Sequence, residues 1–194
     1  MTKSILVAAL VAVAAYANAE LIGFDDINTS LGPVGISDGY AGLNWLNFDA
    51  LDGTDYPVQN GYYYGTISPT NVAFDPPGNV CDFNSDAPFT LESLYITSAW
   101  GPQNCSILGY GPAGLLYSLD PLLGSSPTFF NLHWTGVTQV NFVPEGTSNS
   151  TQIAIDNVDV TLATPEPVTV GPFAIMICGA LLPRHRFRRQ KARP

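Results

Sequence analysis

The sequence predicts an all-β fold, a single antiparallel β-sandwich, for residues 20–163. Gly and Pro recur too often there for a long amphipathic helix, and short apolar or alternating runs lie between them instead. Nine short strands in one domain, separated by turn residues, are typical of a sandwich. The expected strands are residues 21–24, 42–48, 71–74, 89–97, 105–109, 115–118, 128–133, 139–143 and 152–162.

The last expected strand has the clearest alternation of apolar and polar side chains. Ile153 and Ile155 share one face, but further along the strand Val158 and Val160 are the apolar residues and have the opposite parity. Because side chains alternate strictly along a regular strand, the apolar face must switch at residues 156–157. We therefore expect a β-bulge, or the edge of a binding site, at this point.

Residues 1–19 have the pattern of a secretory signal peptide that forms a helix before it is cleaved. Lys3 gives a positive start, residues 5–15 are an unbroken apolar run, and residues 17–19 are small at the expected cleavage site. The apolar run is too short to span a bilayer. We expect export from the cytoplasm, with a mature chain that begins at Glu20.

The C-terminal end has three parts that differ in composition. A Pro-rich linker, residues 164–167, precedes a mostly apolar stretch, residues 168–183, and a basic tail, residues 184–194. An apolar run followed by cationic residues is typical of a short membrane helix whose basic end stays in the cytoplasm. The run is short for a bilayer, but long Arg side chains extend its reach. We expect a secreted or cell-surface protein that this tail anchors in the membrane.

The tail also resembles a known sorting signal. Pro165, Glu166 and Pro167, the apolar span and the arginine-rich end are similar to the bacterial PEP-CTERM signal over residues 165–189. The resemblance implies membrane retention and then cleavage near the motif by an exosortase. The Gly-Pro pair at residues 171–172 and the continuation to Pro194 depart from that pattern. A disordered C-terminus without a sorting role is the alternative.

Charge is the most distinctive feature of the expected domain. Residues 20–163 contain no Lys or Arg and fifteen Asp or Glu, a formal charge of −15, whereas the whole chain carries −9. Nucleic-acid binding is excluded as a function class, because phosphate neutralisation needs Lys or Arg. A cation that prefers oxygen ligands, such as a structural Ca²⁺, is the natural partner of so many carboxylates. Plain solvation of an exported protein is the alternative.

Two acidic groups are candidates for that cation site. Asp25 and Asp26 follow the first expected strand, and Asp156, Asn157 and Asp159 lie in the last one. The first and last strands of a sandwich are often neighbours, so their oxygens are expected to surround one Ca²⁺ ion. The alternative is a turn and a strand-end cap. Asp49, Asp52 and Asp55 lack the acidic residue that would complete a calcium loop and are interpreted as an acidic turn.

Several stretches of the domain resemble an uncharacterised family of secreted β-sandwich proteins from fungi and bacteria. They are Gly-Phe-Asp-Asp at 23–26, Gly-Tyr-Ala-Gly-Leu-Asn-Trp at 39–45, Ile-Ala-Ile-Asp-Asn-Val at 153–158 and, more weakly, residues 94–100. The resemblance implies a jelly-roll-like sandwich similar to galactose-binding domains and carbohydrate-binding modules. It implies a fold and an extracellular location more than an activity.

Aromatic residues are candidates for binding sugar rings, because their flat apolar faces stack on them. Trp45 and Trp134 lie in strand-like runs and are expected in the core. Tyr62, Tyr63 and Tyr64 are the better ligand-binding candidates, because consecutive residues cannot all face inward.

Cysteine usage also bears on the expected location. In an oxidising compartment Cys81 and Cys105 are expected to form a disulfide, and the alternative is two free, buried thiols.

Catalysis has little support in the sequence. The only His of the domain is His133, and no Gly-x-Ser-x-Gly motif occurs. We expect a non-catalytic, surface-retained binding module whose ligand is an extracellular glycan. A structural protein of the cell envelope or extracellular matrix is the first alternative. An acidic glycoside hydrolase, which needs only two carboxylates, is the second.

Overall fold

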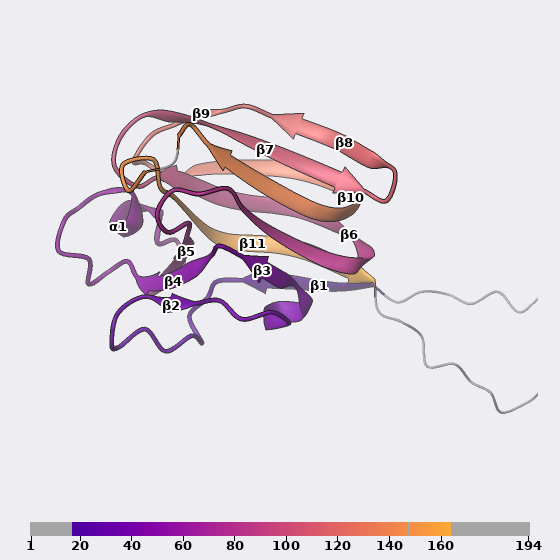
Figure 1. Ribbon diagram of the computed structural model, residues 1–194. Coiled ribbons are helices and arrows are strands. Elements are labelled where there is room, and N and C mark those ends of the chain that lie inside the picture. Colours follow the sequence, from indigo (N-terminus) through magenta and orange to yellow (C-terminus); the bar gives the residue numbers. More distant parts are fainter. Residues whose placement is uncertain (1–16, 147, 164–194) are drawn as a thin grey trace, which may run out of the picture. The chain divides into compact units, whose positions relative to one another are not determined.

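The computed structural model describes residues 17–146 and 148–163 (Figure 1). Within them all strand pairs are antiparallel, and the only α-helix has five residues. The all-β prediction is therefore confirmed. The expected signal helix, linker, apolar segment, sorting motif and basic tail lie outside the described residues, except for the last three residues of the signal peptide.

The described elements follow one another with short connections. The strands are β1 (Ala17–Ile22), β2 (Val34–Gly35), β3 (Asn44–Leu46), β4 (Asp49–Asp52), β5 (Asn71–Phe74), β6 (Cys81–Ser98), β7 (Gln103–Gly111), β8 (Gly114–Leu119), β9 (Leu122–Leu123), β10 (Thr128–Pro144) and β11 (Ile153–Ala163). A 3₁₀ turn, Tyr40–Gly42, precedes β3, and α1 (Gly61–Gly65) precedes β5.

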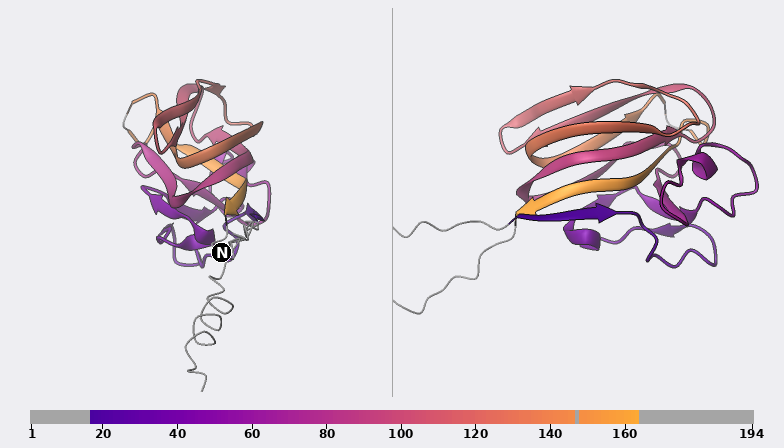
Figure 2. Two further views of the ribbon diagram at one scale, coloured as in Figure 1. Left: turned by 90° about the vertical axis from the view of Figure 1, so that its right-hand side faces the viewer. Right: turned by 180° about the vertical axis from the view of Figure 1, so that it is seen from behind.

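The strands form one connected hydrogen-bonded network. Its order is β2-β4-β5-β11-β6-β10-β7-β8, with β1 paired to β11, β3 to β6 and β9 to β7. Strands β6 and β11 run through the middle of the described domain, and β2 and β8 lie on opposite sides of them (Figures 1 and 2). Segments from both halves of the sequence therefore surround the same core.

Two long strands hold this network together. Strand β6 pairs with β3 through residues 82–84 and with β11 through residues 89–98, while β10 lies along its other edge. The two expected strands at 128–133 and 139–143 belong to a single strand, β10, whose register shifts near Trp134 and Val137. Such bulges bend a strand without ending it, which explains why a break was expected there.

The expected pairing of the first and last strands is confirmed, although β1 covers residues 17–22 and not the expected 21–24. Strand β1 pairs with β11, with Leu21 opposite Asp159. The register between β11 and β6 shifts between Asp156 and Asp159, and Asn157 has a positive φ of 48°. Asn is among the residues that tolerate this conformation best. The bulge therefore lies where the apolar face of the sequence switches.

The core is built around interlocking aromatic rings. Trp45 packs against Phe48 and Phe83 with ring centroids 5.5 and 5.2 Å apart, and Phe142 lies 5.8 Å from both of these phenylalanines. Trp45 and Trp134 are both buried, as the sequence predicts. The Trp45 indole N–H donates to the Tyr40 carbonyl at 3.0 Å, which satisfies the polar atom of this buried ring.

The expected disulfide is wrong, because Cys81 and Cys105 are free thiols in the described domain. Strand β10 lies between them: its Phe142 pairs with Cys81 and its Pro144 pairs with Cys105. Strands on either side of a third are about 10 Å apart in a sheet, whereas a disulfide needs Cα atoms within about 7 Å. Burial raises the pKa of both thiols, which keeps them protonated and unreactive.

Truncation of Phe83 tests whether this aromatic cluster supports the fold. Phe83→Ala removes a fully buried ring, and we expect the free energy of unfolding to fall by about 3–5 kcal/mol. Phe129→Ala, at a ring that is 51% exposed, is the matched control and should cost about 1 kcal/mol or less. Urea unfolding measures both values, and equal losses would contradict the described core.

Candidate functional site

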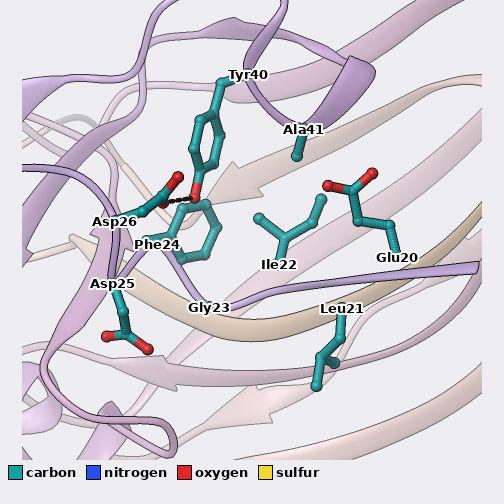
Figure 3. A pocket seen from close by; sticks show the side chains of 9 residues that line it. All are labelled: Glu20, Leu21, Ile22, Gly23, Phe24, Asp25, Asp26, Tyr40 and Ala41. Atoms are coloured by element: carbon teal, nitrogen blue, oxygen red, sulfur yellow. Dashed lines mark hydrogen bonds between the residues drawn. The ribbon is translucent and has the colours of Figure 1, made fainter.

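The acidic residues after β1 point in different directions. Asp26 accepts a hydrogen bond from the Tyr40 hydroxyl at 2.6 Å, while the Asp25 side chain points away from this pair (Figure 3). The two residues line a shallow cavity of about 360 Å³ beside β1. Burial and the nearby carboxylates raise the pKa of Tyr40, so its hydroxyl remains a donor to Asp26. Asp26 is thus bound to the turn before β3.

Asp25 belongs to a different group of oxygen atoms, centred on Gly23. A Cβ atom on Gly23 would lie 2.6 Å from Ser68 Oγ, 3.2 Å from Asp25 Oδ2 and 3.5 Å from Asn157 Oδ1. The absence of a side chain at residue 23 therefore leaves a small space bordered by three oxygens. Asn157 Oδ1 is buried and has no hydrogen-bond partner among the described residues. Such an orphaned acceptor is unusual in a folded protein and calls for a ligand or an ordered water.

Asp156 adjoins this group from the interior. Its carboxylate accepts from the backbone N–H groups of Ile67 and Asn157 at 2.6 Å and of Ser68 at 2.9 Å. Burial raises its pKa to about 6, although these hydrogen bonds act in the opposite direction. Ser68 Oγ lies 3.2 Å from Asp156 Oδ1. Ser68 therefore links the buried carboxylate to the oxygens around Gly23.

The structure thus brings together part of the predicted cation site. Oxygens of Asp25, Ser68 and Asn157 lie near Gly23, and the Asp156 carboxylate accepts hydrogen bonds from Ser68 and Asn157. Ser68 was not among the predicted site residues. Asp26 accepts a hydrogen bond from Tyr40, and Asp159, on β11, lies opposite Leu21 of β1. No three His, Cys, Asp or Glu side chains gather as a metal group in the described residues. The carboxylate, amide and hydroxyl oxygens at Gly23 are of the type that a hard cation such as Ca²⁺ takes as ligands.

A second site is a cleft with an aromatic floor. Trp100 follows β6 and is 43% exposed, and its indole N–H donates to Gln152 Oε1 at 3.0 Å. The rings of Tyr56 and Tyr62 meet Trp100 edge to face, with centroids 6.2 and 5.8 Å away. These residues line a cavity of about 280 Å³ together with Phe74. Because the hydrogen bond fixes the indole, the ring surface is what Trp100 offers to a ligand.

The aromatic cavity adjoins an acidic one. A second cavity of about 230 Å³ shares Pro33, Leu51 and Tyr56 with the first and is also lined by Asp52 and Asp55. We call the two cavities together the Tyr56 cleft. Asp52 Oδ1 accepts from the backbone N–H groups of Thr54 and Asp55 at 2.9 and 3.1 Å. The predicted acidic turn is therefore present at residues 52–55, whereas Asp49 begins strand β4.

The three candidate tyrosines divide between the floor of the cleft and the surface. Helix α1 begins after Asn60, whose side chain accepts from the Tyr62 N–H at 3.1 Å. The helix buries Tyr62, which is 2% exposed, and leaves Tyr63 and Tyr64 37% and 45% exposed. Of the three residues only Tyr62 lines the cleft. Tyr56 was not among the residues predicted to bind a ligand, because only the fold places it beside Trp100.

Asp75 is a buried carboxyl group outside both sites. It is completely inaccessible, its Oδ1 accepts from the Ile153 N–H at 2.6 Å, and its Oδ2 has no partner among the described residues. Burial raises its pKa to about 8 from an ordinary value of 3.8. Asp75 therefore remains protonated in the folded domain at neutral pH.

His133 lies on β10 and contacts a carboxylate of β6 at the surface. Its side chain is 65% exposed, and its Nδ1 lies 2.7 Å from Glu92 Oε2. The same carboxylate accepts from Thr161 Oγ1 at 3.1 Å. The His133–Glu92 contact and the Thr161 hydrogen bond thus connect β10, β6 and β11 at the surface.

None of the helices that the structure describes has the length and apolar character needed to cross a membrane. The expected membrane segment, residues 168–183, lies outside the described part of the chain.

Comparison with known proteins gives only remote similarities. No family model and no curated protein matches the chain. A cyclase from Fischerella sp. TAU is 12% identical, with 78% of this chain and 100% of that chain covered and a TM-score of 0.46. A CBM4 structure is 18% identical over 60% of this chain and 92% of that one, with a TM-score of 0.34. Truncated AlyQ, with CBM32 and alginate lyase domains, is 16% identical over 64% and 34%, with a TM-score of 0.32. Function must therefore be inferred from the residues of this chain.

Asp75 makes the stability of the domain depend on pH. The unfolded chain ionises this group above an ordinary pKa of 3.8, whereas the folded chain keeps it protonated up to a pKa of about 8. Its contribution is thus fully present below pH 4 and is lost as the pH rises toward 8. We expect Asp75→Asn to gain stability relative to the wild type as the pH increases from 5 to 8.

The control for this prediction is Asp86→Asn, which removes one carboxylate from an exposed position of β6. Urea unfolding at several pH values measures each difference from the wild type. A constant difference for Asp75→Asn across the range, or an equal trend for Asp86→Asn, would contradict the assignment to Asp75.

Proposed function

We propose that this chain is an exported, surface-retained, non-catalytic module with a jelly-roll-like sandwich, and that it binds an extracellular glycan in the Tyr56 cleft. The observation that carries the proposal is the exposed ring of Trp100 beside Tyr56, in a cleft that also contains amide and carboxylate groups. Carbohydrate ligands need both an apolar surface for the ring and polar groups for the hydroxyls.

The chemistry of the cleft supports binding over catalysis. Asp52 and Asp55 are its two carboxylates, and the Asp52 carboxylate already accepts hydrogen bonds from the turn that follows it. A hydrolase would need two carboxylates that are free to act as acid and as base or nucleophile, whereas the turn fixes Asp52 and leaves Asp55 as the free one. Residues 1–19 and the tail from residue 164 support export and retention at the cell surface.

Calcium enters the proposal as a structural ion at Gly23. Asp25, Ser68 and Asn157 supply three oxygens from three separate segments, and Asn157 Oδ1 has no other described partner. An ion there would tie the end of β1 to the bulge of β11 and to the loop before β5. This arrangement supports a role of the ion in the stability of the fold, and the ion would not contact the Tyr56 cleft.

Trp100→Ala and Tyr56→Ala test the glycan site. Each removes an aromatic surface from the cleft, and we expect the affinity for a bound glycan to fall by about tenfold or more. The measurement is a glycan array to identify the ligand, followed by titration calorimetry of the full chain and its variants.

The matched controls are Tyr64→Ala and Phe129→Ala, which remove exposed rings that do not line the cleft. They should leave the affinity unchanged. Self-association without binding to any glycan would instead favour a structural protein of the envelope or matrix. Turnover of a glycan that Asp55→Asn abolishes would favour a hydrolase.

Thermal unfolding with Ca²⁺ and with a chelator tests the ion site separately. A ligand that binds only the folded state at 100 times its Kd stabilises that state by about 2.7 kcal/mol, so the midpoint should rise. Asp25→Asn keeps an oxygen to accept from the Asn71 N–H but removes the charge, and it should abolish this rise. Asp86→Asn should retain it. An unchanged wild-type midpoint would reject calcium and leave the glycan proposal intact.

A further inference from the structure

We propose that the Tyr56 cleft selects amino sugars with free, protonated amines over neutral or acidic sugars. This inference rests on the proposed glycan-binding function and specifies the class of its ligand. It is derived from the charges and hydrogen bonds of the residues that border the cleft.

The charged groups of the cleft are all negative. Asp52 and Asp55 lie at one end, and the neutral amides of Gln152 and Asn149 lie at the other. Residues 17–163 contain no Lys or Arg, and the described His, His133, belongs to β10 and pairs with Glu92. A uronic acid, sulfate or sialic acid would therefore enter the cleft without a cationic partner, which is unfavourable for a desolvated anion.

Asp55 is the carboxylate that is free to meet a ligand. Asp52 Oδ1 accepts from two backbone N–H groups and from Thr54 Oγ1, so its orientation is fixed by the turn. The Asp55 side chain accepts none of the hydrogen bonds found between described residues, and it is exposed beside Tyr56. An ammonium group has three donors to offer such a carboxylate, whereas a hydroxyl has one.

The aromatic floor favours the same ligand. The faces of Trp and Tyr attract cations through their quadrupoles, by about 0.5–2 kcal/mol according to exposure. Tyr56 lines both cavities, so a sugar seated on Tyr56 and Trp100 holds its substituents between the aromatic rings and Asp55. The formal charge of −15 over residues 20–163 also draws cations toward the domain. Stacking on the aromatic rings, the Asp55 carboxylate and the net negative charge of the domain thus all favour binding of a positively charged sugar.

Calorimetric titration of the full chain with two probes tests this inference. One probe is a β-linked glucosamine oligosaccharide, and the other is the same oligosaccharide with every amine acetylated. At low ionic strength we expect the free amine form to bind about fivefold to tenfold more tightly. The preference should shrink at high salt, which screens exposed charges.

Three variants separate the causes of the preference. Asp55→Asn should reduce the affinity for the amine form to that for the acetylated form, so that the preference between the two probes is lost. Asp86→Asn removes the same charge from a position outside the cleft and should keep the preference. Trp100→Ala should weaken both probes.

Several outcomes would overturn the inference. Equal affinities for the two oligosaccharides would reject selection for amines while the glycan-binding proposal stands. If Asp55→Asn and Asp86→Asn lose the preference for the amine form equally, that preference arises from the net negative charge of the domain and not from the cleft. Spermine is a polyamine without sugar rings. If it binds as tightly as the amine oligosaccharide, the cleft is a cation site with no selectivity for sugars. If neither oligosaccharide nor any other glycan binds, the proposed function itself is rejected.

Discussion

The absence of Lys and Arg from the folded domain determines how its carboxylates are satisfied. With no guanidinium or ammonium group in residues 17–163, a carboxylate that leaves water must accept from backbone N–H groups, hydroxyls, side-chain amides or a His ring instead. Asp38 accepts from the Trp45 N–H, Asp25 from the Asn71 N–H and Asp156 from the loop at Ile67. The Asp156 bonds join positions 88 and 89 residues apart in the sequence. Acidic residues therefore act as long-range connections between strands and loops.

The same constraint shapes the two candidate sites. Carboxylates that backbone groups satisfy, such as Asp52 and Asp156, are fixed in place and border the places where ligands are proposed to bind. At each proposed site one acceptor has no hydrogen-bond partner among the described residues: Asn157 Oδ1 at the Gly23 group and the Asp55 carboxylate in the Tyr56 cleft. Both are acceptors, and both therefore favour ligands that carry positive charge or donate hydrogen bonds.

Local patterns predicted the elements better than the site. The expected strand at 71–74 agrees with β5, and the switch of apolar face in the last strand located the bulge. Strands β2 and β9 have two residues each, too few to show an alternation, and α1 is a single capped turn among tyrosines. The expected disulfide failed because strand order, which separates Cys81 from Cys105, is a long-range property. The Tyr56 cleft was also beyond local patterns, since residues from distant segments, including Pro33, Trp100 and Gln152, line it.

The direction of β11 has a consequence for where a ligand would be held. Gln152, at the cleft, immediately precedes this strand, and Ala163, where the described domain ends, pairs with Ala17 of β1. Eleven extended residues separate these points by about 36 Å. Helix α1 and the β1–β11 ends accordingly lie at opposite poles of the domain (Figure 1). The Tyr56 cleft therefore lies at the end of the domain opposite to Ala163, the residue at which β11 ends (Figure 1).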